Sequence, residues 1–218
     1  MQPRSGGHSP PAPPASPDRR ARPAQPAGRA GPVRPAVPAW LLPAAVLALA
    51  AGLIFTGLGS SSLHNRDEAR HALVAENILA GGDWLTLHYE GAPYFNKAPL
   101  KFWLTALTFR AFGVSEWTVR LWSALFALGA VALTGLLGAR LYDRRTGLLA
   151  MLVLATSPQF LYSHCARTGE LDSALLFCWV LACLLIVAGL RRRPLFYLGC
   201  AAIGLCGMVK HLGFVSEL

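Results

Sequence analysis

Long apolar runs separated by short charged turns are the feature that most constrains how this chain folds. Runs with little or no charge recur at residues 40–59, 119–139, 147–164, 173–190 and 194–211. Because about 20 apolar residues in a helix cross a bilayer core of roughly 30 Å, we interpret each run as a membrane span. The composition agrees, since 54% of the residues are hydrophobic and only 14% are charged. We therefore predict an all-α, polytopic transmembrane helix bundle.

The segment before the first run, residues 1–38, is predicted to be a disordered tail. It holds 11 of the 16 prolines together with six arginines, and such a mixture buries too little apolar surface to fold. The first run is an alternative candidate for a signal peptide, but the preceding 39 residues are too long for an n-region and no small-residue cleavage site follows. We expect an uncleaved first span and a transmembrane domain over residues 39–218.

The basic residues indicate which ends of the spans face the cytoplasm. Positive charge is concentrated in the tail and in the turns at 140–145 and 191–193, whereas the segments 60–118 and 164–172 carry no excess of it. The positive-inside rule then predicts a cytoplasmic N-terminus and places those two segments together on the outer face. A net charge of +9 would also suit a nucleic-acid-binding protein. Because the arginines flank apolar spans instead of forming one surface, we predict no nucleic-acid partner.

The long outer loop, residues 60–118, is predicted to contain two helices that lie at the membrane surface. The first covers 67–80, where alanine and leucine supply helix propensity and a pair of glycines follows. The second covers 99–112, which is apolar but carries Lys101 and Arg110. The uncharged stretch between those cations is too short to cross a bilayer, so this helix is expected in the interface.

Acidic residues at the outer rim are the first candidates for chemistry. Asp67 and Glu68 follow shortly after the first span, and partial desolvation there raises the pKa of a carboxylate toward values useful for a general base. The alternative is that Asp67, or Asn65, caps the following helix, and the sequence leaves both open. Asp67 and His71 also share a helical face at a spacing compatible with a metal site, although a third ligand is missing.

Charged residues elsewhere in the two outer segments complete the set of candidates. Lys97 lies where the long loop returns to the membrane, and its ammonium can hold a phosphate or simply extend to the headgroups. Glu170 and Asp172 precede the span that begins at residue 173. Carboxylates so close to a membrane helix are costly unless they are paired or functional, although Asp172 can also serve as a helix cap.

The spaced residues of the first outer loop form a pattern that resembles a known family. They are Arg66, Asp67, Glu68, Ala69, Arg70, Ile78, Leu79, Ala80, Gly82, Asp83, Trp84, Gly91, Tyr94, Phe95, Lys97, Pro99, Leu100 and Trp103. The chain, over about residues 40–190, resembles the N-terminal part of the polytopic GT-C glycosyltransferases. It is most similar to the group of the lipid A aminoarabinose transferases and the protein O-mannosyltransferase-like enzymes.

The resemblance implies an enzyme of the bacterial inner membrane that transfers a sugar from a polyprenyl-phosphate carrier to a lipid or protein acceptor at the outer face. It implies that Asp67, with Glu68, is catalytic. It also implies that the ammonium of Lys97 holds the departing lipid phosphate, whose charge grows in the transition state. The implied substrate-binding residues are Lys97, Asp172, Arg66, Arg70, Tyr94 and Glu170. The expected partners are the polyprenyl-phosphate sugar donor, the lipid or protein acceptor, and membrane lipids.

Two departures from the family pattern shape the remaining expectations. Asn96 stands where many lipid A transferases have a glutamate thought to contact a metal. We therefore assign no metal ligand and leave a divalent cation as a possible cofactor. Family members are more than twice as long as this chain, so the alternative function is a truncated, catalytically inactive membrane protein that still binds a lipid phosphate.

Overall fold

The computed structural model describes residue 38, residues 40–63 and residues 66–210. The chain divides into two units, Met1–Ala36 and Val37–Leu218, and only the second is described below. The predicted disordered tail, apart from Pro38, lies outside the described residues, as does His211 after the last helix.

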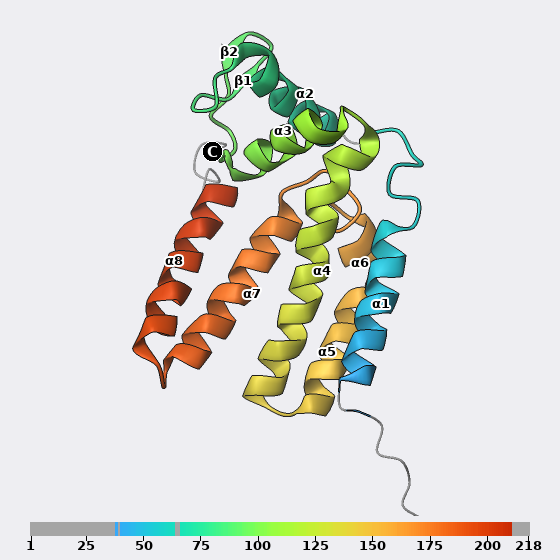
Figure 1. Ribbon diagram of the computed structural model, residues 1–218, viewed down its shortest axis with the longest axis vertical. Helices are drawn as coiled ribbons and strands as arrows, with labels where there is room; N and C mark the ends of the chain where they lie inside the picture. The colour runs from blue at the N-terminus through green and yellow to red at the C-terminus, as the bar shows by residue number, and fades with distance from the viewer. Residues whose placement is uncertain (1–37, 39, 64–65, 211–218) are drawn as a thin grey trace, which may run out of the picture. The chain divides into compact units, whose positions relative to one another are not determined.

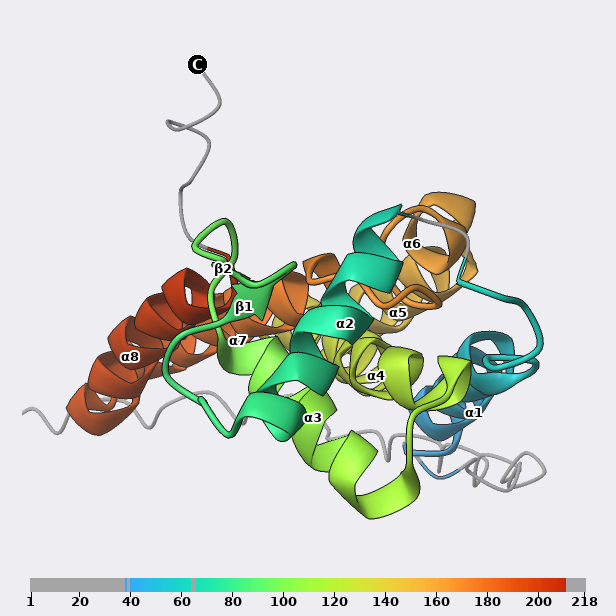
Figure 2. The same ribbon diagram turned by 90° about the horizontal axis from the view of Figure 1, so that it is seen from above.

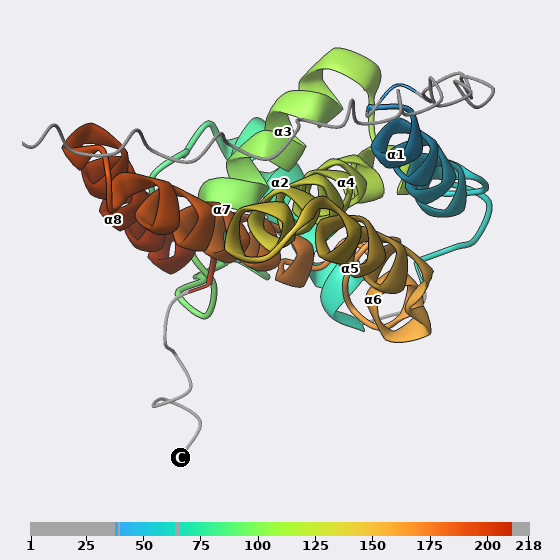
Figure 3. The same cartoon turned by 90° about the horizontal axis from the view of Figure 1, so that it is seen from below.

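Long helices that correspond to the predicted apolar runs stand side by side in a bundle (Figure 1). They are α1 (Leu41–Phe55), α4 (Glu116–Leu141), α5 (Arg144–Thr156), α7 (Asp172–Gly189) and α8 (Arg193–Val209). In the view from below (Figure 3), α7 and α8 lie on one side of α4, and α1 and α5 lie on the other. The helices approach closely through glycine, since a Cβ on Gly147 in α5 would lie 2.4 Å from the carbonyl oxygen of Gly135 in α4.

Two of these helices meet the length and apolarity expected of a membrane span. Among the described residues, α4 and α7 do so, and a third of the apolar stretch of each is buried inside the molecule. The helices α1 and α8 are apolar but shorter. The prediction of a mostly helical chain is therefore confirmed, while five complete spans remain a prediction.

The run at 147–164 was wrongly predicted to be one continuous helix. Helix α5 ends at Thr156, and a short helix α6 (Pro158–Tyr162) follows. Ser157, between them, is extended, with φ −68° and ψ 120°. The ring of Pro158 disfavours a helical conformation in the residue before it but suits the first turn of a new helix.

A surface layer lies across one end of the bundle (Figures 1 and 2). It consists of α2 (Arg66–Gly81), a hairpin of β1 (His88–Tyr89) and β2 (Ala92–Pro93), and α3 (Leu100–Phe112). The two helices predicted in the long loop are thus present, while their place at a membrane surface stays a prediction. Helix α2 buries an apolar face that includes Val74 and Ile78, and it ends where Gly82 adopts a positive φ of 69°.

The hairpin corrects the prediction of an all-α chain. It pairs His88 with Pro93 and Tyr89 with Ala92 in an antiparallel register. The two turn residues, Glu90 and Gly91, have φ values of 52° and 78°, which matches the right-handed twist of a two-residue hairpin. This small ribbon brings the chain from α2 back toward α3.

The segments predicted to share the outer face do lie at the same end of the bundle. The surface layer and the loop 163–171 both lie there, whereas the basic turns between α4 and α5 and between α7 and α8 lie at the opposite end (Figure 1). The loop and the layer enclose one apolar core together with α4, α7 and α8. Residues distant in sequence are therefore brought together above the bundle.

Candidate functional site

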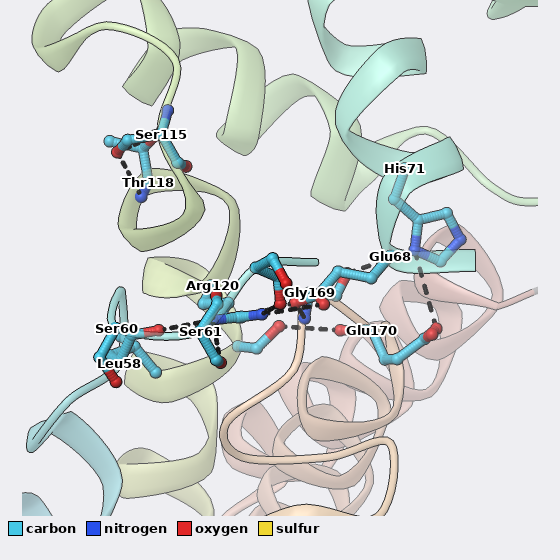
Figure 4. A network of polar contacts seen from close by, with 12 residues as sticks. Leu58, Ser60, Ser61, Glu68, His71, Ser115, Thr118, Arg120, Gly169 and Glu170 are labelled. Atoms are coloured by element: carbon cyan, nitrogen blue, oxygen red, sulfur yellow. Dashed lines mark hydrogen bonds and ion pairs between the residues drawn. The ribbon is translucent and has the colours of Figure 1, made fainter. Parts of the chain in front are cut away.

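A buried ion pair joins α2 to α4 beneath the surface layer. The Nε and Nη2 atoms of Arg120 lie 2.7 and 3.1 Å from the two carboxylate oxygens of Glu68 (Figure 4). The side chains are only 4% and 2% exposed. The Nη atoms of Arg120 also donate to the carbonyl oxygens of Leu58, Ser61 and Ser62 at 2.8–3.0 Å. Because each charged group has acceptors or donors around it, the pair offsets the cost of its burial.

The same carboxylate also fixes the loop 163–171. The amide of Gly169 donates to Oε1 of Glu68 at 2.7 Å. A Cβ at position 169 would lie 2.7 Å from Cγ1 of Val119, so only glycine fits here without displacement of a neighbour. The hydroxyl of Ser123 in α4 donates to the carbonyl of Glu170 at 2.9 Å. The loop is thus held against α2 and α4 at two successive residues.

His71, one turn after Asp67 in α2, is buried between this loop and α3. Its Nδ1 lies 3.2 Å from the carbonyl oxygen of Gly169, and its ring meets Phe102 edge-on at 5.2 Å. Burial, followed by the charge of Lys101, lowers the pKa of His71 to about 4. The imidazole is therefore neutral at pH 7, and we infer that Nδ1–H donates to Gly169.

Glu170 presents a carboxylate next to this histidine. Its Oε2 lies 3.7 Å from Nδ1 of His71, and its Oε1 lies 3.6 Å from Nδ1 of His164. Burial is the main cause that raises the pKa of Glu170, and the negative charge of Asp67 raises it further. A carboxyl group with a raised pKa at the edge of the site is suited to proton transfer or to binding a polar substrate group.

Asp67 lies within the first turn of α2 and not at its cap, since the helix begins at Arg66. Its Oδ1 lies 3.1 Å from Nη1 of Arg70, and the two side chains are 44% and 27% exposed. The guanidinium of Arg70 faces the ring of Tyr89 at 5.5 Å, and the Tyr94 hydroxyl raises the pKa of Arg70. Asp67 therefore offers an accessible carboxylate that a neighbouring cation orients.

Lys97 lies at the same end of the molecule as Asp67, half-buried in the loop before α3. The charges of Asp67 and Lys97 both act on His71, the first raising and the second lowering its pKa. Arg66, at the start of α2, is exposed.

Asp172, the first residue of α7, forms an ion pair across to the end of α8. Its Oδ1 lies 2.8 Å from Nζ of Lys210, and both side chains remain more than 40% exposed. The predicted role of Asp172 in substrate binding is untested. The pair shows that Lys210 lies at the same end of the bundle as Asp172.

Beside the buried ion pair lies a cavity of about 690 Å³. It is lined by Gly57, Ser60, Ser61, Glu68, Arg120, Tyr162, Ser163, His164, Arg167 and Thr168. Arg167 donates to the carbonyl oxygens of Leu53 and Thr56 at the end of α1, at 2.6 and 2.8 Å. Within the described part of the chain, no three His, Cys, Asp or Glu side chains are grouped to hold a metal ion.

The sequence missed the residues that organise the site. Lys101, Arg120 and Ser123 were not assigned roles, yet they bind the loop or its partner Glu68. The available signal was a charge within an otherwise apolar helix, which requires a buried partner. Glu68 itself was expected to be catalytic, and its geometry favours a positioning role instead, because both carboxylate oxygens are engaged.

The chain is similar to several known proteins. Residues 96–216 match the family model of dolichyl-phosphate-mannose-protein mannosyltransferase. The undecaprenyl phosphate-α-4-amino-4-deoxy-L-arabinose arabinosyl transferase of Pseudomonas aeruginosa is 34% identical over 181 residues, which are 79% of this chain and 31% of that protein. An uncharacterised protein of Aquifex aeolicus is 32% identical over 167 residues, or 75% of this chain and 33% of its own length.

A solved structure has the same fold. The crystal structure of ArnT from Cupriavidus metallidurans bound to undecaprenyl phosphate superposes with a TM-score of 0.71 at 26% identity, covering 79% of this chain and 33% of that one. The apo form of that protein gives a TM-score of 0.67. The chain thus spans about a third of the length of the relatives that it matches.

Proposed function

Because the chain belongs to the dolichyl-phosphate-mannose-protein mannosyltransferase family and corresponds to the N-terminal portion of a GT-C glycosyltransferase, we propose that it supports transfer of a sugar from a polyprenyl phosphate. The observation that carries the proposal is the convergence of two outer segments. The charges of Asp67 and Lys97 both reach His71, and Glu170 of the second segment lies 3.7 Å from the same ring. An acid, an amine and a second carboxyl group thus act on one histidine at one end of the bundle.

Asp67 acts as the base, or as the carboxylate that orients the acceptor. Of the neighbouring acids Asp67 and Glu68, Asp67 is the accessible one. Glu68 is buried in an ion pair with Arg120. Lys97 binds the departing lipid phosphate, whose negative charge grows as the glycosidic bond breaks. Since phosphate is already a good leaving group, no second carboxylic acid is needed to protonate it, in contrast to a glycosidase.

The other predicted residues shape the site around that displacement. Arg70 orients Asp67 by their contact at 3.1 Å, and Tyr94 supports the guanidinium. Glu170 and Asp172 position the polar acceptor, and Arg66 attracts its anionic groups at the exposed start of α2. These assignments rest on position and charge.

The names of the relatives favour an undecaprenyl-phosphate-linked aminoarabinose as donor. We propose a lipid acceptor, with lipid A the first to test. The family model keeps a protein hydroxyl as the second candidate.

The decisive test is the incorporation of labelled sugar from undecaprenyl phosphate-4-amino-4-deoxy-L-arabinose into lipid A or protein, in membranes that contain the protein. Asp67→Asn is expected to lower turnover by roughly 10²–10⁴-fold. Asp83→Asn is the matched control, because Asp83 is a part-exposed acid of the same loop, which accepts from the amides of Leu85 and Thr86 and lies 3.9 Å from Nδ1 of His88. Equal turnover by Asp67→Asn and wild type would remove Asp67 from its role. Binding of undecaprenyl phosphate without any transfer would support the inactive lipid-binding alternative.

We further propose a multi-pass protein of the bacterial inner membrane with a cytoplasmic N-terminus and the surface layer outside. The basic turns lie at the end of the bundle away from that layer (Figure 1), which is the distribution that the positive-inside rule predicts. A cysteine introduced as Glu90→Cys is expected to react with an impermeant maleimide in intact cells, and Arg144→Cys is not. The reverse labelling pattern would overturn this topology.

A further inference from the structure

A lysine ammonium is buried where the surface layer meets the loop 163–171. Lys101 of α3 is 3% exposed, and its Nζ donates to the successive main-chain carbonyls of Gly169 and Glu170, residues 68 and 69 positions further along the chain. Burial of an ammonium is costly unless its donors are satisfied. An apolar side chain would fill the same space without that cost, so the lysine is expected to have a role beyond filling space.

The two peptide groups that Lys101 binds are restrained from other sides as well. The amide of Gly169 donates to Glu68 at 2.7 Å, and the carbonyl of Glu170 accepts from Ser123 at 2.9 Å. Helices α2, α3 and α4 therefore each contribute a side chain to one short stretch of backbone. Of these contacts, the lysine is the one that spans both residues.

This restraint determines where the Glu170 carboxylate lies. The backbone of Glu170 is fixed on its carbonyl side, while its side chain turns toward Nδ1 of His71 at 3.7 Å (Figure 4). The stretch ends two residues later at Asp172, the first residue of α7. A shift of this backbone would move both carboxylates relative to Asp67 and Lys97.

We propose that Lys101 is a positioning residue for sugar transfer, which holds the backbone of Gly169 and Glu170 so that the Glu170 carboxylate faces the site beside His71. This inference rests on the proposed function. Lys101 itself touches neither substrate, because its ammonium is enclosed by the protein. Loss of its hydrogen bonds releases the loop and misplaces Glu170, while Lys97 and the donor-binding surface on the outer loop stay in place.

The test compares Lys101→Met with Arg110→Met in the complete protein in membranes. Methionine has a similar length and shape but no donor, and Arg110 is an exposed cation of the same helix α3. Lys101→Met is expected to lower kcat on the order of 10²-fold, the cost of a small misplacement, with the donor KM changed less than about threefold. Arg110→Met is expected to keep both constants. A rise in donor KM with unchanged kcat, or no change in either, would overturn the proposal.

The loop carries its own reporter, so the inference is also tested without activity. Cys165 lies in the loop and is 8% exposed, and burial raises the pKa of its thiol to about 12. An impermeant maleimide is expected to label the wild type slowly and Lys101→Met at least about tenfold faster, as an unreactive buried thiol becomes accessible. The double variant Lys101→Met, Cys165→Ser identifies the labelled site. Unchanged protection of Cys165 would contradict the proposed restraint.

Ser123→Ala provides the same test if Lys101→Met does not accumulate. It removes one hydrogen bond to the Glu170 carbonyl and leaves the lysine in place. A loss in kcat of about threefold to tenfold, smaller than for Lys101→Met, together with faster Cys165 labelling, supports the proposal. Unaltered kcat and labelling would contradict it. A wild type without transferase activity would instead overturn the proposed function, while the labelling result would still test the restraint.

Discussion

Two regions of this molecule use the same kinds of charged side chain in opposite ways. The junction, which we define as Glu68, Lys101, Arg120, Ser123 and Gly169, lies beneath α2, and its ion pair is 2–4% exposed. The rim, defined as Asp67, Arg70, Asp172 and Lys210, carries ion pairs whose side chains are 27–44% exposed. The junction charges are saturated by the protein itself, whereas the rim charges remain accessible to a ligand.

The two regions begin at adjacent residues of one helix. Asp67 and Glu68 are neighbours in α2, but successive residues of a helix point about 100° apart. Glu68 turns inward to Arg120, while Asp67 remains at the surface beside Arg70. Glu68 thus stabilises the fold, while Asp67 stays accessible to a ligand. The predictions below test this difference.

The largest expected effect comes from breaking the junction at its centre. Arg120→Met leaves the buried Glu68 carboxylate without its counterion, which is expected to cost about 3–5 kcal/mol of unfolding free energy. Denaturant unfolding in detergent, followed by circular dichroism, measures this difference. Arg110→Met is the matched control, since that arginine is exposed. A stability loss below about 1 kcal/mol, the range of exposed pairs, would show that the junction differs little from the rim.

How far the sequence predicted this molecule depends on the range of the contacts. The helices follow from local apolar runs, and the break before Pro158 follows from one residue. The junction does not, because Arg120 meets Glu68 from 52 residues away and Gly169 meets it from 101 residues away. A charge inside an apolar helix requires a buried partner, but no such partner was predicted for Lys101 or Arg120. Which partners they have is decided only by the packing of α2, α3 and α4.

The residues of the candidate site were chosen in a different way from the scaffold that holds them. Asp67, Lys97 and Glu170 were selected from composition, position and a family pattern, and their roles stay predictions; the structure places Glu170 3.7 Å from His71, which lies one turn after Asp67 in α2. The division of Asp67 from Glu68 could not be read, because both lie in the first turn of α2. Only the location of Arg120 shows which of the two is buried.

A second prediction uses pH to test His71, which contacts the carbonyl of Gly169 in the junction. Burial lowers the pKa of His71 to about 4, below the value near 6.5 expected in the unfolded chain. The unfolded state therefore takes up a proton first, and the unfolding free energy is expected to fall by up to about 3 kcal/mol as pH drops from 6.5 to 4, at 1.36 kcal/mol per unit. Above pH 7 this contribution is constant.

The comparison of wild type with His71→Gln isolates that contribution. Glu170, whose pKa is raised by burial, acts in the opposite direction, since its folded form takes up a proton more readily than its unfolded form. Unfolding curves at pH 7, 6, 5 and 4 are expected to converge for the two proteins toward acid pH, because only the wild type loses stability through His71. Parallel curves would mean that the histidine is not held neutral by its surroundings.

The third prediction concerns packing at the junction, with no change in charge. In Gly169→Ala, the new Cβ would lie 2.7 Å from Val119 and 2.9 Å from Cγ of Glu68. Overpacking of this kind is expected to cost about 1–3 kcal/mol in thermal or denaturant unfolding. Gly82→Ala is an unsuitable control because Gly82 has a positive φ. Gly52→Ala in α1 has open space around the new methyl group and is expected to leave stability unchanged or slightly increased, so equal losses at both positions would contradict the crowding of Gly169.

The smallest effect on stability is expected at the rim. Asp172→Asn removes the ion pair with Lys210, but both side chains are exposed by more than 40%, so water and salt screen the charges. The expected loss of unfolding free energy is about 0–1 kcal/mol, and it shrinks further at high ionic strength. If Asp172 positions the acceptor as proposed, Asp172→Asn lowers sugar transfer although the fold is intact. The junction variants Arg120→Met and Gly169→Ala are instead expected to lose stability. A loss of several kcal/mol in Asp172→Asn would instead place this pair with the junction, because only charges removed from water give effects of that size.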